Sequence, residues 1–178
     1  MSYDLYCYKS TTGSPDADEA EVVISPENEI EPSVDEWKQM NAVASALISF
    51  DPRLEIFQFD HKKIAENQSI SIDEARRLTN YIEVNTPEDD ANYVQFNITR
   101  DHVSLSFGFG MPPDIIERIM DYVDVICKET SYFLYDPQDG SVSDPINPIP
   151  LSDDEKKSWV ENDDVSFLKE DKPWWKFW

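Results

Sequence analysis

The sequence predicts an α+β fold, a two-layer sandwich in which two main helices lie on one face of a largely antiparallel sheet. Apolar residues recur at helical spacing in two long segments, and short alternating segments lie before, between and after them. The uneven order of helices and strands, with a meander between the two helices, favours this class over a parallel α/β fold. The 178 residues have room for one ordinary domain, which we expect to span residues 1–140.

An acidic segment separates the first strand from the first long helix. Residues 2–9 are apolar on both sides of the expected strand, which is typical of a strand covered on both faces. The segment 11–36 has nine acids and no base, and its glycine and prolines predict mainly loop with a short strand at 22–24. Ser33 and Glu36 have capping-box spacing, so we expect a helix over 34–49 that is stopped by Asp51 and Pro52.

The remaining elements are expected from the same patterns. Strands are predicted at 54–59 and 81–84 around an ambiguous stretch 64–78, and a hairpin pairs 93–98 with 103–109. Pro112 and Pro113 open a second amphipathic helix that continues to Cys127. A strand at 132–135 leads into a turn at 136–140. Residues 141–178 are expected to form a Pro-rich connection, a short helix near 152–160 and an aromatic tail that packs on the domain or on a partner.

The charge balance excludes several classes of protein. There are 37 acids against 15 bases, a net charge of −22, so the chain lacks the clustered Lys and Arg that a general nucleic-acid binder needs. The apolar fraction of 40% is too high for a disordered acidic chain. We expect a cytoplasmic protein without a transmembrane segment, because the sequence shows no secretory signal and no apolar stretch of roughly 20 residues. Cys7 and Cys127 lie in apolar patterns and are expected to be buried thiols, with a disulfide or a reactive thiol as the alternative.

Motifs that carry chemistry are few. The sequence has no HExxH, CxxC or GxSxG motif, and FGFG at 107–110 lacks both the third glycine of a dinucleotide fingerprint and the Lys-Ser/Thr ending of a P-loop. His61 and His102 stand in turn-like surroundings and are interpreted as surface residues. We therefore expect no cofactor, no metal and no catalytic residue, and hence a protein that is not an enzyme. A carboxylate- or metal-dependent hydrolase is the alternative, because carboxylates are abundant.

Two features indicate binding to another protein. The acidic loops would attract a basic protein partner, although solubility alone or mimicry of nucleic acid would also explain them. The C-terminal PWWKFW needs a surface to cover it, whether its own sheet, another subunit, a partner or a membrane interface. A structural homo-oligomer sealed by this tail is therefore a further hypothesis. The candidate partner-binding residues are Asp16, Asp18, Glu19, Glu21, Asp136, Asp139, Trp174, Trp175, Phe177 and Trp178.

Four stretches carry a resemblance to known proteins: MSYDLYCYK at the start, ISFDP after the first helix, HVSLSFGFG in the hairpin and SYFLYDPQDG near residue 140. Together they resemble a class of small uncharacterised bacterial proteins, several families of which accompany polymorphic or contact-dependent toxins and act as immunity proteins. The resemblance covers roughly residues 1–140 and implies that the chain binds and neutralises a basic toxin. The acidic segment 11–36 and the aromatic tail depart from that pattern.

Overall fold

The computed structural model describes residues 2–25, 31–87, 93–108 and 113–143. Within these ranges it has five helices and a seven-stranded antiparallel sheet, and the predicted α+β class is confirmed. In chain order the elements are β1 (Ser2–Tyr8), α1 (Ala17–Ile24), α2 (Val34–Phe50), β2 (Glu55–Ile56), α3 (His61–Gln68), α4 (Ile72–Leu78), β3 (Ile82–Asn85), β4 (Val94–Ile98), β5 (His102–Gly108), α5 (Pro113–Thr130), β6 (Phe133–Asp136) and β7 (Ser141–Ser143).

The strands follow the order β2-β3-β4-β5-β1-β6-β7, and every neighbouring pair is antiparallel. The N-terminal strand β1 therefore lies inside the sheet, between β5 and β6. Its register places Leu5 opposite Leu105 and Cys7 opposite Val103, which stacks apolar side chains on one face. The predicted hairpin is confirmed as β4 and β5, in which Phe96 lies opposite Leu105.

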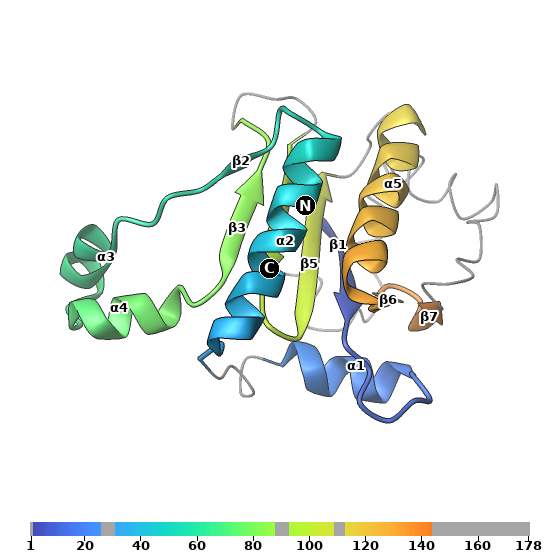
Figure 1. Cartoon of the computed structure of the whole chain (residues 1–178), viewed down its shortest axis with the longest axis horizontal. Coiled ribbons are helices and arrows are strands. Elements are labelled where there is room, and N and C mark those ends of the chain that lie inside the picture. The colour runs from blue at the N-terminus through green and yellow to red at the C-terminus, as the bar shows by residue number, and fades with distance from the viewer. Residues whose placement is uncertain (1, 26–30, 88–92, 109–112, 144–178) are drawn as a thin grey trace, which may run out of the picture.

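The two long helices α2 and α5 lie side by side over one face of the sheet, as predicted (Figure 1). Each helix buries one stripe against the strands, and the main core formed in this way includes Met40, Val43, Ala44, Leu47, Ile119, Tyr122, Val123 and Ile126. The capping box of α2 is present, because Glu36 accepts from the Ser33 amide at 2.6 Å and the Glu36 amide donates to the Ser33 hydroxyl at 3.3 Å.

The two cysteines meet in this main core. Cys7 of β1 and Cys127 of α5 are both buried free thiols, so the expected burial is confirmed and no disulfide links them. A hydrogen bond with Cys127 and burial raise the pKa of the Cys7 thiol well above its usual value. The Cys7 thiol therefore stays protonated, and both buried side chains pack as small apolar residues.

The acidic segment contains a helix where a short strand was predicted. Residues 22–24 end α1 and do not pair with the sheet. Asp16 caps this helix by accepting a hydrogen bond from the Glu19 amide at 2.8 Å. Ala20 is fully buried in a second, smaller core with Tyr8 and Tyr135. The face of β1 opposite α2 and α5 is thus covered by α1, which explains why the strand is apolar on both sides.

The strand predicted at 54–59 is shorter than expected, and a helical arm follows it. Only Glu55 and Ile56 join the sheet, and the ambiguous stretch beyond them forms α3 and α4. We call residues 60–79 the α3–α4 arm. Its two helices pack against each other and stand apart from the sheet (Figure 1). At its base the ring of Phe59 contacts the rings of Phe57 and Tyr81, with centroids 5.2 Å apart in each pair.

The last described elements form a small hairpin at the edge of the sheet. The predicted turn at 136–140 is confirmed, and Gly140 adopts a φ of 72° that a side chain would disfavour. Residues 141–143, which were expected to begin the Pro-rich connection, pair with β6 as β7. The short helix predicted near 152–160 and the aromatic tail lie outside the described residues, and so do Trp174, Trp175, Phe177 and Trp178.

Candidate functional site

The acids predicted to bind a partner are concentrated on α1, which the fold holds against the sheet. The inward side of the helix carries Ala17, Ala20, Val23 and Ile24, all in the smaller core. We call Asp16, Asp18, Glu19 and Glu21 the α1 acidic face. Between Ser10 and Ser25 the chain has these four acids and no base. Among the described residues, none of the ion pairs involves an acid of α1.

Two of these acids also organise the local backbone. Asp16 is the N-cap of α1. Glu19 folds back over the preceding loop and accepts hydrogen bonds from the Ser10 hydroxyl at 2.8 Å, the Thr11 amide at 2.7 Å and the Thr12 amide at 3.0 Å. Desolvation opposes its ionisation, but these hydrogen bonds outweigh it and lower the pKa of Glu19 to about 2. Its charge therefore persists throughout the neutral and mildly acidic range.

The other two acids point outward and remain available to a partner. Asp18 is exposed in the first turn of the helix, and Glu21 is exposed one turn later on the same side. The Tyr135 hydroxyl donates to Glu21 at 3.2 Å. Burial, followed by the neighbouring Glu21 charge, raises the pKa of Tyr135 to about 12. This contact fixes the helix against β6, so the two outward carboxylates are presented on a rigid element.

The two acids of the β6–β7 turn have different environments. Asp136 is only 8% exposed and accepts hydrogen bonds from the Tyr3 hydroxyl and from the Gln138 amide. This carboxylate holds the turn against the sheet and is withdrawn from the surface at which a partner was expected. Asp139 is exposed at the tip of the turn and accepts from the Ser141 amide at 2.8 Å. Of the two, Asp139 alone can extend the acidic surface.

Sequence reasoning missed a buried carboxylate at the end of α2. Asp51 is 5% exposed and accepts hydrogen bonds from the Tyr122 hydroxyl at 2.5 Å and from Nη2 of Arg53 at 2.7 Å. Arg118 lies 3.6 Å from the same carboxylate oxygen. Hydrogen bonds from Arg53 hold the pKa of Asp51 well below its usual range, and the hydrogen bond from Tyr122 acts in the same direction. Together they outweigh desolvation, which raises the pKa. The Asp51 carboxylate thus links the end of α2 to α5. Because it stays ionised and hydrogen-bonded, it is better suited to a structural role than to proton transfer.

A polar ladder on the sheet was also missed. Asn85, Gln95, Asn97, Ser104, Ser106 and Asp4 alternate with core residues along β3, β4, β5 and β1. The Asn97 amide donates to the Ser104 hydroxyl at 3.3 Å, and the Ser106 hydroxyl donates to Asp4 at 2.5 Å. The alternation VQFNI was the signal in the sequence. These groups mainly satisfy one another on the part of the sheet that α1 does not cover.

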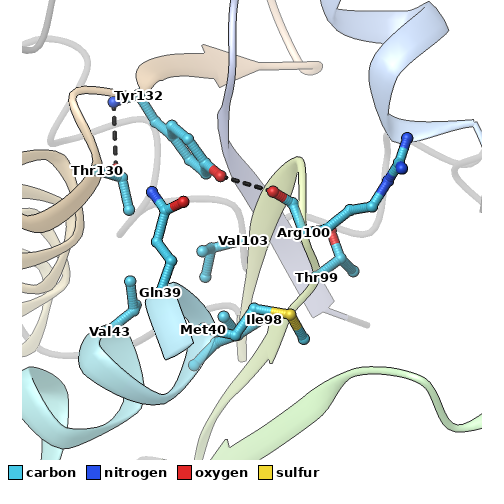
Figure 2. A pocket seen from close by; sticks show the side chains of 9 residues that line it. All are labelled: Gln39, Met40, Val43, Ile98, Thr99, Arg100, Val103, Thr130 and Tyr132. Atoms are coloured by element: carbon cyan, nitrogen blue, oxygen red, sulfur yellow. Dashed lines mark hydrogen bonds between the residues drawn. The ribbon is translucent and has the colours of Figure 1, made fainter. Parts of the chain in front are cut away.

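The depression between the start of α2 and the β4–β5 turn has no interior space for a water molecule. Figure 2 shows Tyr132 at its rim, with the hydroxyl donating to the Arg100 carbonyl at 2.9 Å. The nearby His102 is largely buried, which lowers its pKa to about 4 and keeps it neutral. In the described ranges no group of three or more His, Cys, Asp and Glu residues is placed to hold a metal ion.

Comparison with known proteins adds no relative. No protein family, no curated protein and no solved structure matches the chain. None of the helices in the described part of the chain is both long and apolar enough to cross a bilayer. A function must therefore be inferred from the geometry and the charges of the chain itself.

Proposed function

We propose that this chain is a non-enzymatic protein-binding module that recognises a basic protein through the α1 acidic face. The observation that carries the proposal is a short helix whose apolar side is anchored in the fold while Asp18 and Glu21 face outward with no base within the segment 10–25. Asp139, at the neighbouring turn, supplies a further carboxylate. Neutralisation of a basic toxin by a bacterial immunity protein is the form of this function that the resemblance implies.

The physical basis of the proposal is electrostatic steering. Carboxylates of one sign on a rigid element raise the local potential, speed the encounter with a basic partner and disfavour acidic ones. Their contribution falls as salt screens the charges. The hydrogen bonds that hold the Glu19 pKa at about 2 keep this one carboxylate charged well below neutral pH.

Reversal of the two outward charges tests the proposal. The partner is first captured from the source cell and purified, and its association rate with the full chain is then measured at several salt concentrations. Asp18→Lys combined with Glu21→Lys should slow association at low salt by about tenfold or more and flatten its salt dependence, because it removes steering. Asp18→Lys combined with Glu21→Gln, which keeps an acceptor for the Tyr135 hydroxyl, should act in the same direction.

A matched control separates a local surface from net charge. Asp121→Lys combined with Asp124→Lys makes the same change at the same spacing on α5. We expect this control to slow association much less. An association rate that is unaltered by the α1 reversal, or altered equally by both reversals, would show that the α1 acidic face is not the docking surface.

A further inference from the structure

The α3–α4 arm leaves much of its apolar surface uncovered. Its buried side chains are those of Ala65 and Ala75, whereas Ile72 is 46% exposed and Leu78 is 51% exposed. The helices have eight and seven residues, and helices this short are marginal in water without packing on another element. In the arm each helix packs mainly on the other, so a further contact would stabilise both.

The base of the arm extends this exposed surface. Seven large apolar side chains are exposed in the described ranges, and four of them lie between residues 56 and 78. They are Ile56, Phe57, Ile72 and Leu78. Phe57 is 44% exposed although its ring also contacts Phe59. Apolar exposure concentrated on one projecting element is typical of a protein–protein contact.

The charge of the arm fits a second copy of the chain better than a basic protein. Residues 60–79 contain four acids and four bases, so the arm is neutral while the whole chain has a net charge of −22. A neutral surface does not select a basic protein. A surface that meets its own copy about a two-fold axis must be self-complementary, and a face bearing both signs meets that condition. Since the arm stands out from the sheet, contact between two arms also keeps the acidic bodies apart (Figure 1).

We propose that the α3–α4 arm is the contact between two copies of this chain, paired arm to arm about a two-fold axis. Two arms bring four helices together, and Ile72 and Leu78 of each copy become buried between them. This contact is independent of the α1 acidic face. It therefore leaves that face free on both copies.

The mass in solution tests this contact. Ile72→Asp places a charge at the first residue of α4, directly after the cap Ser71. Val34→Asp is the matched control, because Val34 is the first residue of α2 after the cap Ser33 and is 73% exposed. An acid at this helical position favours the helix, so neither variant should unfold its helix.

Sedimentation velocity of the full chain should give a species of twice 20.6 kDa for the unaltered protein and for Val34→Asp. Ile72→Asp should raise the dissociation constant of the dimer at least tenfold, because the two-fold axis places the added charge in the contact twice. A monomer at every concentration of the unaltered protein, or a dimer that Ile72→Asp does not weaken, would overturn the proposal. Loss of the dimer on deletion of residues 173–178, with Ile72→Asp still dimeric, would assign the contact to the tail.

Two readouts need no variant in the arm. Amide exchange in residues 61–78 should slow as the protein concentration rises through dimerisation, while exchange in residues 17–24 should not change. Added salt should leave the dimer unchanged or strengthen it, since it screens repulsion between the bodies. Arm exchange that is independent of concentration, or a dimer that dissociates with salt, contradicts arm-to-arm pairing.

Discussion

At the scale of single residues, Asp51 is a buried carboxylate that links two helices of the fold. It ends α2, lies in the interior and is held by a tyrosine of α5 and an arginine two residues on. A buried carboxylate is costly unless it is paired and hydrogen-bonded, and here both conditions are met. The ionised form is therefore the one that the fold stabilises, which the lowered pKa of Asp51 also indicates.

Asp51→Asn should lower the free energy of unfolding at neutral pH by about 2–3 kcal/mol, because it removes charged hydrogen bonds from Tyr122 and Arg53. Urea unfolding measures the difference. Asp124→Asn is the control, since it makes the same change in an exposed pair with Lys128 and should cost at most about 0.5 kcal/mol. Similar losses in the two variants would refute a special role of Asp51.

The difference in unfolding free energy between the unaltered protein and Asp51→Asn should depend on pH, with a sign that follows from the pKa of Asp51. Because the pKa of Asp51 in the fold lies below its ordinary value of 3.8, its contribution is complete above that pH and is lost as the pH falls toward the folded pKa. The gap in stability between the unaltered protein and Asp51→Asn should therefore narrow below about pH 4. A gap that stays constant to lower pH would contradict this assignment.

At the scale of elements, α1 and α2 pack into two hydrophobic cores of different size. α2 contributes to the main core between the long helices and the sheet, whereas α1 covers the smaller core around Tyr8 and Tyr135. An eight-residue helix has little stability of its own and depends on this docking. Local opening of α1 should therefore be separable from global unfolding.

Ala20→Gln and Ala44→Gln test this division, because both alanines are fully buried on helices that face the sheet. Ala20→Gln should speed amide exchange in residues 17–24 and cost about 1–3 kcal/mol. Ala44→Gln should destabilise the whole domain by about 3 kcal/mol or more, because its amide stays buried in the main core, whereas local opening of α1 can expose the amide of Ala20→Gln to water. Equal global effects, with no local change in α1, would show that the two cores unfold as one.

The elements that were predicted correctly have strong local signals. The helix from Val34 has a capping box and a long apolar stripe, and the hairpin of β4 and β5 has strict alternation. α1 was missed because Val22, Val23 and Ile24 favour a strand by propensity, although Asp16 and Glu19 have the spacing of a helix start. The helix buries Ala20 in a core with Tyr8 and Tyr135, and the contact with Tyr135 is not local.

The candidate site was predictable only in part for the same reason. The acids of α1 are visible in the sequence, but their rigid presentation depends on the contact between Glu21 and Tyr135, 114 residues apart. The burial of Asp136 depends on Tyr3, which is 133 residues away. The sequence pattern of the arm is ambiguous because α3 and α4 are short and bury little beyond Ala65 and Ala75. Such contacts depend on the order of the strands, which the pattern of one sequence does not specify.

At the scale of the whole molecule, the net charge of −22 opposes the compact state. Most acids in the described ranges have no basic partner, and the pairs Lys38–Asp35, Arg76–Asp73 and Lys128–Asp124 are exposed. Repulsion between like charges is greatest when the chain is folded, because folding brings the charges together. Salt should therefore stabilise the fold while it weakens binding to a basic partner.

Urea unfolding at rising sodium chloride concentrations tests whether charge repulsion destabilises the fold. Urea is uncharged, so it does not itself screen the charges. Sodium chloride is used because chloride adds little of the general stabilisation that sulfate produces. The Debye length falls from about 30 Å to about 3 Å between 0.01 M and 1 M salt, so the free energy of unfolding should rise across this range. Asp121→Lys combined with Asp124→Lys raises the net charge by four and should reduce the slope. If salt lowered the stability, local pairs such as that of Asp51 and Arg53 would outweigh the repulsion. An unchanged slope in the variant would mean that the salt effect is not one of net charge.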